Sequence, residues 1–450
     1  MAPSNRNGSS IPKYFLLTGL FLLVIGMFYG VLGGFQYLIQ GFLKSLLSFD
    51  KVRPLHVSSV VFWIIIGASG SVLTYMQEHT GKGLRWPMLA SVQFVVFVVS
   101  IFAILFTYVF GMFGGREYWE FNPWFALPIT IGWVMFAINF IASIGSLKNQ
   151  PVYVWQWLTG VVFFLFTFLE SYLWIIPYFR DNVINDMTVQ WKAYGSMVGA
   201  WNMLIYGCSM FLLTKISGDQ YIAHSRMAFA LYFTGLFNLM FNWGHHIYTL
   251  PTHDFIKHVS YIVSMTELAI LGRILWLWSS SLREARKLLH FTPYRLVVAA
   301  DLWVLLTLAL AIVMSVPAIN VYTHGTHVTV AHTMGATIGI NSFLLLAFVA
   351  DIFTRGGQAP FVSERLFRRG LLLANSSLLI FWISLIVAGV LKASWQVMET
   401  RTAFSLMMLQ LRPVFIVFTL SGIVLMTGLF MIVYALFRNY TSTFSSDKLS

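Results

Sequence analysis

Apolar stretches of about 20 residues recur along almost the whole chain, and they constrain its fold more than any other feature. Each stretch is long enough to cross a hydrocarbon core about 30 Å thick as a helix. The chain is 58% hydrophobic and only 10% charged, whereas an ordinary soluble domain carries roughly 25% charged residues. A soluble fold is therefore excluded. We predict an all-α membrane protein, a bundle of about twelve transmembrane helices.

The polar breaks between these stretches predict how the chain is organised. Spans are expected near residues 14–43, 54–77, 88–113, 122–146, 152–176, 191–214, 227–250, 255–280, 295–318, 326–352, 370–395 and 411–437. This divides the chain into an N-terminal tail at 1–13, a membrane domain at 14–437 and a C-terminal tail at 438–450. Lys and Arg are more frequent in the loops on the side of the termini, so we expect both tails to be cytoplasmic and the protein to lie in the inner (plasma) membrane.

Charge and cysteine usage exclude two further classes of protein. The net charge of +12 does not indicate a nucleic-acid partner, because the basic residues lie in loops between spans and follow the usual orientation bias. The expected surroundings are a lipid bilayer. The single cysteine, Cys208, lies inside an apolar stretch. An internal disulfide and a cysteine-based metal site are therefore excluded, and Cys208 is expected to pack in the core.

Four histidines are placed where they can bind a metal or a haem. His56 opens the second span, His245 and His246 close the seventh, and His332 lies early in the tenth. In the expected topology all four lie near the non-cytoplasmic face, in one layer. Imidazole is a common ligand of iron and copper, and ionisable side chains in a membrane usually face the bundle interior. The competing interpretation is four unrelated histidines at helix ends, each bonded to water or backbone.

The motif His332-Thr333-Met334 adds a second candidate ligand. Residues i and i+2 of a helix are about 200° apart, so the imidazole and the thioether point to opposite sides. One helix could thus ligate two haems that flank it, since thioether sulfur is a known haem ligand. On spacing alone, Met334 is more simply a packing residue.

Several segments, taken together, resemble the catalytic subunit of cytochrome c-dependent nitric oxide reductases, a branch of the haem-copper oxidase superfamily. The resemblance covers nearly the whole chain and implies a haem-copper oxidase-like fold. It is carried, in this order, by Tyr14–Gln40 leading into Arg53-Pro54-Leu55-His56, by Gly115-Arg116-Glu117-Tyr118-Trp119-Glu120, by Trp201–Gly218, by Gly244-His245-His246, by Glu267, and by Tyr322-Thr323-His324-Gly325-Thr326 followed by Ala331-His332.

The resemblance implies a role for each of these residues. It makes His56 an axial ligand of a low-spin haem b, and His332 the proximal ligand of a high-spin, b3-like haem. His245 and His246 would bind a non-haem iron or another metal beside it. Three further assignments concern the surroundings of these groups: Glu117 and the backbone of Gly67 as ligands of a Ca²⁺ ion, and Glu267 as a proton-handling residue.

The sequence departs from the family pattern in two places. The family's His-Gly-His motif reads His332-Thr333-Met334 here, so the resemblance makes Met334 the second ligand of the low-spin haem. On the sixth span, Tyr194, Val198 and Asn202 stand where the family has a metal-binding His, a metal-binding Glu and a further Glu. Valine cannot be a ligand. Tyr194 could bind metal, hydrogen-bond a bound oxygen species, or only fill space.

Three functions remain open from the sequence. The first, which the resemblance implies, is a redox enzyme that acts on NO or O₂ and receives electrons from a small membrane-anchored c-type cytochrome subunit. This chain has no C-x-x-C-H motif, since that needs two cysteines. The second is a non-catalytic haem subunit that transfers electrons or senses a gas. The third is a cofactor-free transporter whose histidines relay protons.

Overall fold

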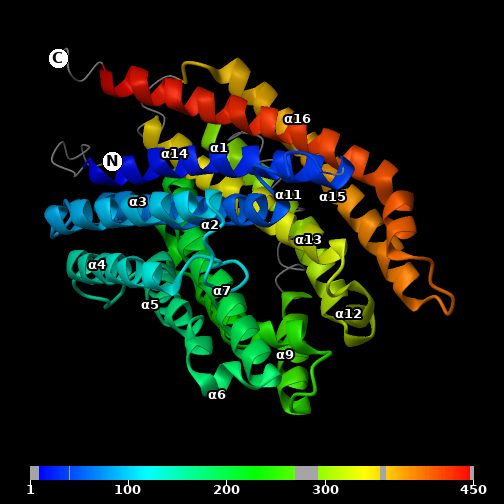
Figure 1. Cartoon of the computed structure of the whole chain (residues 1–450). Coiled ribbons are helices and arrows are strands. Elements are labelled where there is room, and N and C mark those ends of the chain that lie inside the picture. The colour runs from blue at the N-terminus through cyan, green and yellow to red at the C-terminus, as the bar shows by residue number, and fades with distance from the viewer. Residues whose placement is uncertain (1–9, 40, 269–291, 355–360, 446–450) are drawn as a thin grey trace. The chain divides into compact units, whose positions relative to one another are not determined.

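The computed structural model describes residues 10–39, 41–268, 292–354 and 361–445, and Figure 1 shows that these ranges are built from helices. The α-helices are α1 (Ile11–Leu38), α2 (Phe49–Thr80), α3 (Pro87–Val109), α4 (Ala126–Ile144), α5 (Val152–Glu170), α6 (Pro177–Arg180), α7 (Val183–Ser217), α8 (Arg226–Phe241), α9 (Asp254–Met265), α11 (Thr292–Ser315), α12 (Pro317–Thr323), α13 (His327–Met334), α14 (Phe343–Phe353), α15 (Glu364–Val397) and α16 (Phe404–Ser445). Two short elements matter for the site: the 3₁₀ helix η4 (Asn242–Ile247) and the π-helix η5 (Gly335–Ser342).

The multi-pass helical fold predicted from the sequence is confirmed. Within the described residues, ten helices are long and apolar enough to cross a membrane. The predicted span at 227–250 is α8, which has only 16 residues and continues into η4. The span predicted at 255–280 begins as α9, but its second half lies outside the described residues. Ends of the tails, 1–9 and 446–450, also lie outside them.

Contacts divide the chain into two compact units. Unit 1 consists of Met1–Leu23 and Val57–Thr266, and unit 2 of Val24–His56 and Glu267–Ser450. Both α1 and α2 therefore contribute to each unit. His245, His246 and Tyr194 belong to unit 1, whereas His56, His332 and Met334 belong to unit 2.

Unit 1 is organised around the contact between α5 and α7. A Cβ at Gly160 of α5 would lie 2.6 Å from Leu204 Cδ2 and 2.8 Å from the Ala200 carbonyl oxygen, so only glycine permits this approach. Local signals fix the ends of α7. The Asn182 side chain accepts hydrogen bonds from two backbone amides of the first turn, and Gly218 ends the helix with a φ of 72°.

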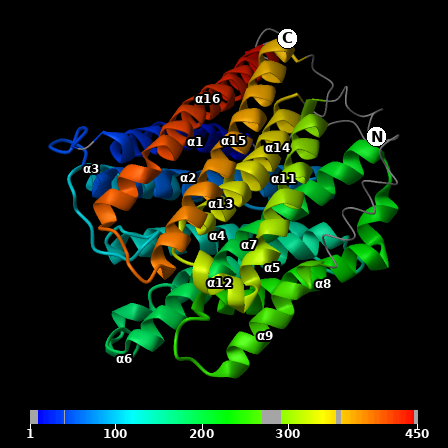
Figure 2. The ribbon, with the colours of Figure 1, turned by 90° about the vertical axis from the view of Figure 1, so that its right-hand side faces the viewer.

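In unit 2, α15 and α16 run side by side, as Figure 2 shows, and α11 packs against η5 and α14. A Cβ at Gly339 of η5 would lie 2.3 Å from Trp303 of α11. The span predicted at 326–352 is therefore not one regular helix, because it contains the π-helix. The Ser342 hydroxyl donates to the Thr337 carbonyl five residues earlier, which fits the wider turn. π-helical segments are rare and occur frequently at functional sites.

Candidate functional site

The imidazole of His56 is held by the glycine-bearing face of α1. Its Nδ1 lies 2.7 Å from the Gly26 carbonyl oxygen. A Cβ at Gly30 would lie 2.8 Å from the imidazole Cε1, so the ring occupies the space that Gly30 leaves. A carbonyl only accepts hydrogen bonds, so Nδ1 carries the proton and Nε2 is free to act as a ligand. This arrangement is typical of metal-ligating histidines, whose second ring nitrogen is fixed by a backbone carbonyl.

His332 and Met334 lie at the end of α13, where the α-helix changes into the π-helix. Both side chains are half-buried, and Nδ1 of His332 is buried without a partner within hydrogen-bonding geometry. Thr307 Oγ1 and Trp382 Nε1 pack closely against Gly335, at 2.4 and 3.3 Å from the position of a Cβ. Neither atom has a hydrogen-bond partner in the part of the chain that the structure describes. Buried polar atoms are normally satisfied, so this region fits a bound group or ordered water.

His245 and His246 lie side by side in η4, with ring centroids 4.2 Å apart. His246 stacks on Trp191 of α7, at 4.7 Å between centroids and 11° between planes. The His245 Nδ1 lies 3.0 Å from Asn242 Oδ1, and Ser264 of α9 also donates to that oxygen. The pair is therefore fixed by neighbours on three elements.

A close contact between η4 and α7 determines where this pair lies. A Cβ at Gly195 would be 2.7 Å from Trp243 Cβ, so the glycine allows η4 to approach the helix. Val198, one turn further along α7, is 37% exposed. The Oδ1 of Asn202 is buried and has no partner among the described residues. Neither residue completes a metal site with the histidine pair, and no group of three or more His, Cys, Asp or Glu able to hold a metal occurs within the described ranges.

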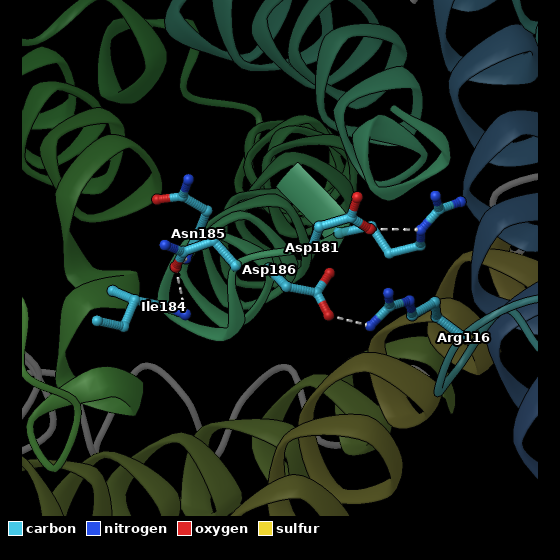
Figure 3. A network of polar contacts seen from close by, with 7 residues as sticks. Arg116, Asp181, Ile184, Asn185 and Asp186 are labelled. Atoms are coloured by element: carbon cyan, nitrogen blue, oxygen red, sulfur yellow. Dashed lines mark hydrogen bonds and ion pairs between the residues drawn. The ribbon is translucent and has the colours of Figure 1, made fainter. Parts of the chain in front are cut away.

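Tyr194 is directed toward the loop between α3 and α4. Its ring meets that of Tyr118 edge-on, with centroids 5.5 Å apart, and only 7% of the residue is exposed. The same loop is tied to α7 by an ion pair between Arg116 and Asp186, drawn in Figure 3. The Arg116 guanidinium also lies 5.0 Å from the centroid of the Trp174 ring. Helix α7 thus contacts this loop twice, through the Tyr194 ring and through the Asp186 carboxylate.

The two residues predicted to bind calcium come from α2 and from the loop between α3 and α4. Glu117 is in the loop, whose Trp119 ring contacts Phe62 at 5.8 Å. Gly67 is five residues further along α2, about 7.5 Å at the rise of a helix. Its carbonyl accepts a hydrogen bond from the Ser71 hydroxyl inside the helix. The calcium site at Glu117 and Gly67 stays a prediction.

Glu267 is half-buried and begins the second part of the chain assigned to unit 2. The residues that follow it, from 269, lie outside the described ranges. Its proton-handling role stays a prediction.

Sequence reasoning missed the residues that orient the histidines, above all Gly26, Gly30 and Trp191. The α1 glycines had a usable signal: Gly26, Gly30 and Gly34 are spaced four apart, the pattern that permits close approach between membrane helices. Trp191 had no such signal, since an aromatic residue near a span end is ordinarily an interfacial anchor.

Comparison with known proteins defines the class. The chain belongs to the family described as Cytochrome C and Quinol oxidase polypeptide I, whose family model matches residues 10–424. Its members are membrane oxidoreductases of the haem-copper oxidase superfamily, which bind haem groups and a non-haem metal.

Particular relatives show how divergent the chain is within this family. It is 25% identical over 419 residues to a nitric oxide reductase subunit of Stutzerimonas stutzeri, covering 85% of this chain and 84% of the relative. It is 20% identical over 427 residues to cytochrome c oxidase subunit 1 of Rhodobacter capsulatus, covering 88% and 78%. The fold matches a heme-copper terminal oxidase dimer solved by cryo-EM, with a TM-score of 0.72 and 14% identity over 96% of this chain and 84% of that one.

The contact between His56 and Gly30 generates a test. Replacing Gly30 by Val should displace the imidazole, because the added atoms would occupy its ring position. We expect loss of about half of the bound haem and of the low-spin signal in the visible and electron paramagnetic resonance spectra. The matched control is Gly33→Val, since a Cβ at Gly33 meets its nearest neighbour only at 3.6 Å. Equal haem content in both variants would contradict the placement of His56.

Proposed function

We propose that this chain is the haem b redox subunit of a membrane complex, and that it takes electrons from a c-type cytochrome and delivers them to a gas, NO or O₂. His56 and Met334 hold the low-spin haem b, and His332 holds the high-spin, b3-like haem. The observation that carries the proposal is the orientation of His56, whose Nδ1 is committed to Gly26 and whose Nε2 is free. The family to which the chain belongs binds haem, so a haem iron is the expected partner of that imidazole.

The chain's own residues have distinct tasks in this proposal. When bound, the haems supply reversible one-electron chemistry and a coordination position for a small gas. Gly26 fixes the tautomer of His56, and the spacing of two residues within α13 directs His332 and Met334 to different sides. Glu267 accepts and releases protons for the reaction, and the buried hydroxyl of Tyr194 is the second catalytic candidate.

The second metal distinguishes this chain from its relatives. His245 and His246 alone do not make a full ligand set for iron, and Tyr194 faces the loop with Tyr118. The residues present do not fit a tightly bound non-haem iron. This favours a second candidate function, a non-catalytic haem subunit that transfers electrons or senses a gas.

The metal content tests this interpretation of the histidine pair. We expect two haems but well under one non-haem iron or copper for each purified chain. Restoring a histidine and a carboxylate with Tyr194→His and Val198→Glu should raise the non-haem metal content, because imidazole and carboxylate ligands are regained. A stoichiometric second metal in the unmodified protein would show that the site is completed by other residues.

Gas consumption separates the two candidate functions in the same preparations. The enzyme hypothesis predicts consumption of NO or O₂ when a reduced c-type cytochrome is supplied, with loss of activity in His332→Ala. Intact haem spectra without any consumption of either gas would overturn the enzyme hypothesis and leave the electron-transfer or sensing subunit.

The ligand Met334 has its own test. Thioether coordination raises the reduction potential of a haem relative to two histidines. Met334→His should therefore lower the midpoint potential of the low-spin haem and shift its visible bands, as measured by redox titration. The control is Met227→His on α8, an exposed methionine of unit 1. An unchanged potential in Met334→His would mean that another residue is the second ligand.

A further inference from the structure

Basic residues gather at the end of unit 2 that carries His56. The segments 41–56 and 392–412 contain six basic residues and only two acidic ones, Asp50 and Glu399. The basic residues are Lys44, Lys51, Arg53, Lys392, Arg401 and Arg412. We call these six residues the basic collar. Lys44, Arg401 and Arg412 are exposed, and the other three are half-buried.

Contacts within unit 2 bring the segments of the basic collar to one end. The Tyr37 ring, at the end of α1, contacts Phe49 of α2 at 5.5 Å and Phe415 of α16 at 5.1 Å. His327, which opens α13, contacts Phe415 at 5.3 Å. Lys392, near the end of α15, donates to the Gly325 carbonyl at 3.0 Å. These contacts bring the segments of the basic collar near the start of α2, which carries His56, and the start of α13, whose last residue is Met334.

The corresponding helix ends of unit 1 have the opposite balance of charge. Their segments carry the basic residues Arg116, Arg180, Lys192 and Lys257, and the acidic residues Glu117, Glu120, Glu170, Asp181, Asp186 and Asp254. Three of the basic residues there are paired with carboxylates, in Arg116–Asp186, Arg180–Asp181 and Lys192–Glu170. The segments of unit 2 thus carry an excess of basic residues, whereas those of unit 1 carry an excess of acidic residues.

An apolar cavity of about 250 Å³ lies at the same end of unit 2. It is lined by Tyr322, Thr323, Val328, Val390, Ala393, Ser394 and Val397, which come from α12, α13 and α15. The nearby His324 adds little charge at neutral pH, because burial lowers the pKa of its imidazole. The positive charge of this end is therefore that of Lys and Arg.

We propose that the basic collar and this apolar cavity form the docking surface for the electron donor, and that the donor is a c-type cytochrome with an acidic face around its haem. This inference rests on the proposed function and adds the chemistry of the partner to it. Complementary charge steers encounter and raises the association rate by 10- to 1,000-fold at low ionic strength. The small apolar cavity then supplies contact area without tight binding, as a donor that must leave again requires.

The test measures reduction of the haems in the full-length protein by anaerobic stopped-flow. The probes are two reduced soluble c-type cytochromes, one with net negative and one with net positive charge at pH 7. At low ionic strength the acidic cytochrome should reduce the protein faster than the basic one. Added salt should remove the difference, because charges on the exposed surface are screened.

Charge reversal locates the surface. The double variant Lys44→Glu and Arg401→Glu should slow association with the acidic cytochrome about 10-fold or more at low salt. The matched control, Arg180→Glu and Lys257→Glu, makes the same change of charge on unit 1 and should stay within about twofold of the unmodified rate. Equal effects of the two double variants, or faster reduction by the basic cytochrome, would overturn the proposal.

Two further readouts separate the ways in which the proposal can fail. Reduction of the haems by ascorbate with a small mediator should be unchanged in both double variants, because the haems themselves are intact. A protein without haem would instead contradict the proposed function. If the collar variant alters only the binding of anionic-lipid vesicles and leaves cytochrome kinetics unchanged, the collar binds lipid headgroups and the docking proposal is wrong.

Discussion

The hydrogen bond from His56 to the Gly26 carbonyl is the interaction on which the functional account depends. In a lipid environment an imidazole is costly unless its polar atoms have partners, and this bond satisfies one nitrogen while leaving the other available. It is possible because Gly30 has no side chain where the ring lies. Gly26 and Gly30 on α1 thereby set the orientation and the protonated nitrogen of His56 on α2.

The two sets of histidines differ in what surrounds them. His56 has one ring nitrogen committed to Gly26 and the other available. His332 lies among buried polar atoms that have no hydrogen-bond partner within the described residues, next to the π-helix that follows Met334. His245 and His246 are instead stacked and hydrogen-bonded among protein groups, with Trp191 covering one ring. In the proposed function the haem ligands are retained and the second metal has lost ligands, because Tyr194 and Val198 stand where the resemblance expects a metal-binding His and Glu.

The sequence predicted the membrane fold because the cost of unsatisfied backbone in lipid leaves few alternatives to long apolar helices. It also predicted that the tenth span carries His332 and Met334. It did not predict the π-helix, in which Gly339 packs closely against Trp303 of another helix. Contacts between distant helices decide such details, and residue spacing along one helix does not contain them.

The central claim is that this bundle holds two b-type haems through His56, Met334 and His332. The most direct measurement is a reduced-minus-oxidised visible spectrum of the purified chain, with haem quantified for each polypeptide. The account predicts b-type bands with two haems per chain, and loss of the low-spin component alone in His56→Ala. A colourless protein, or a spectrum that His56→Ala leaves unchanged, would contradict it.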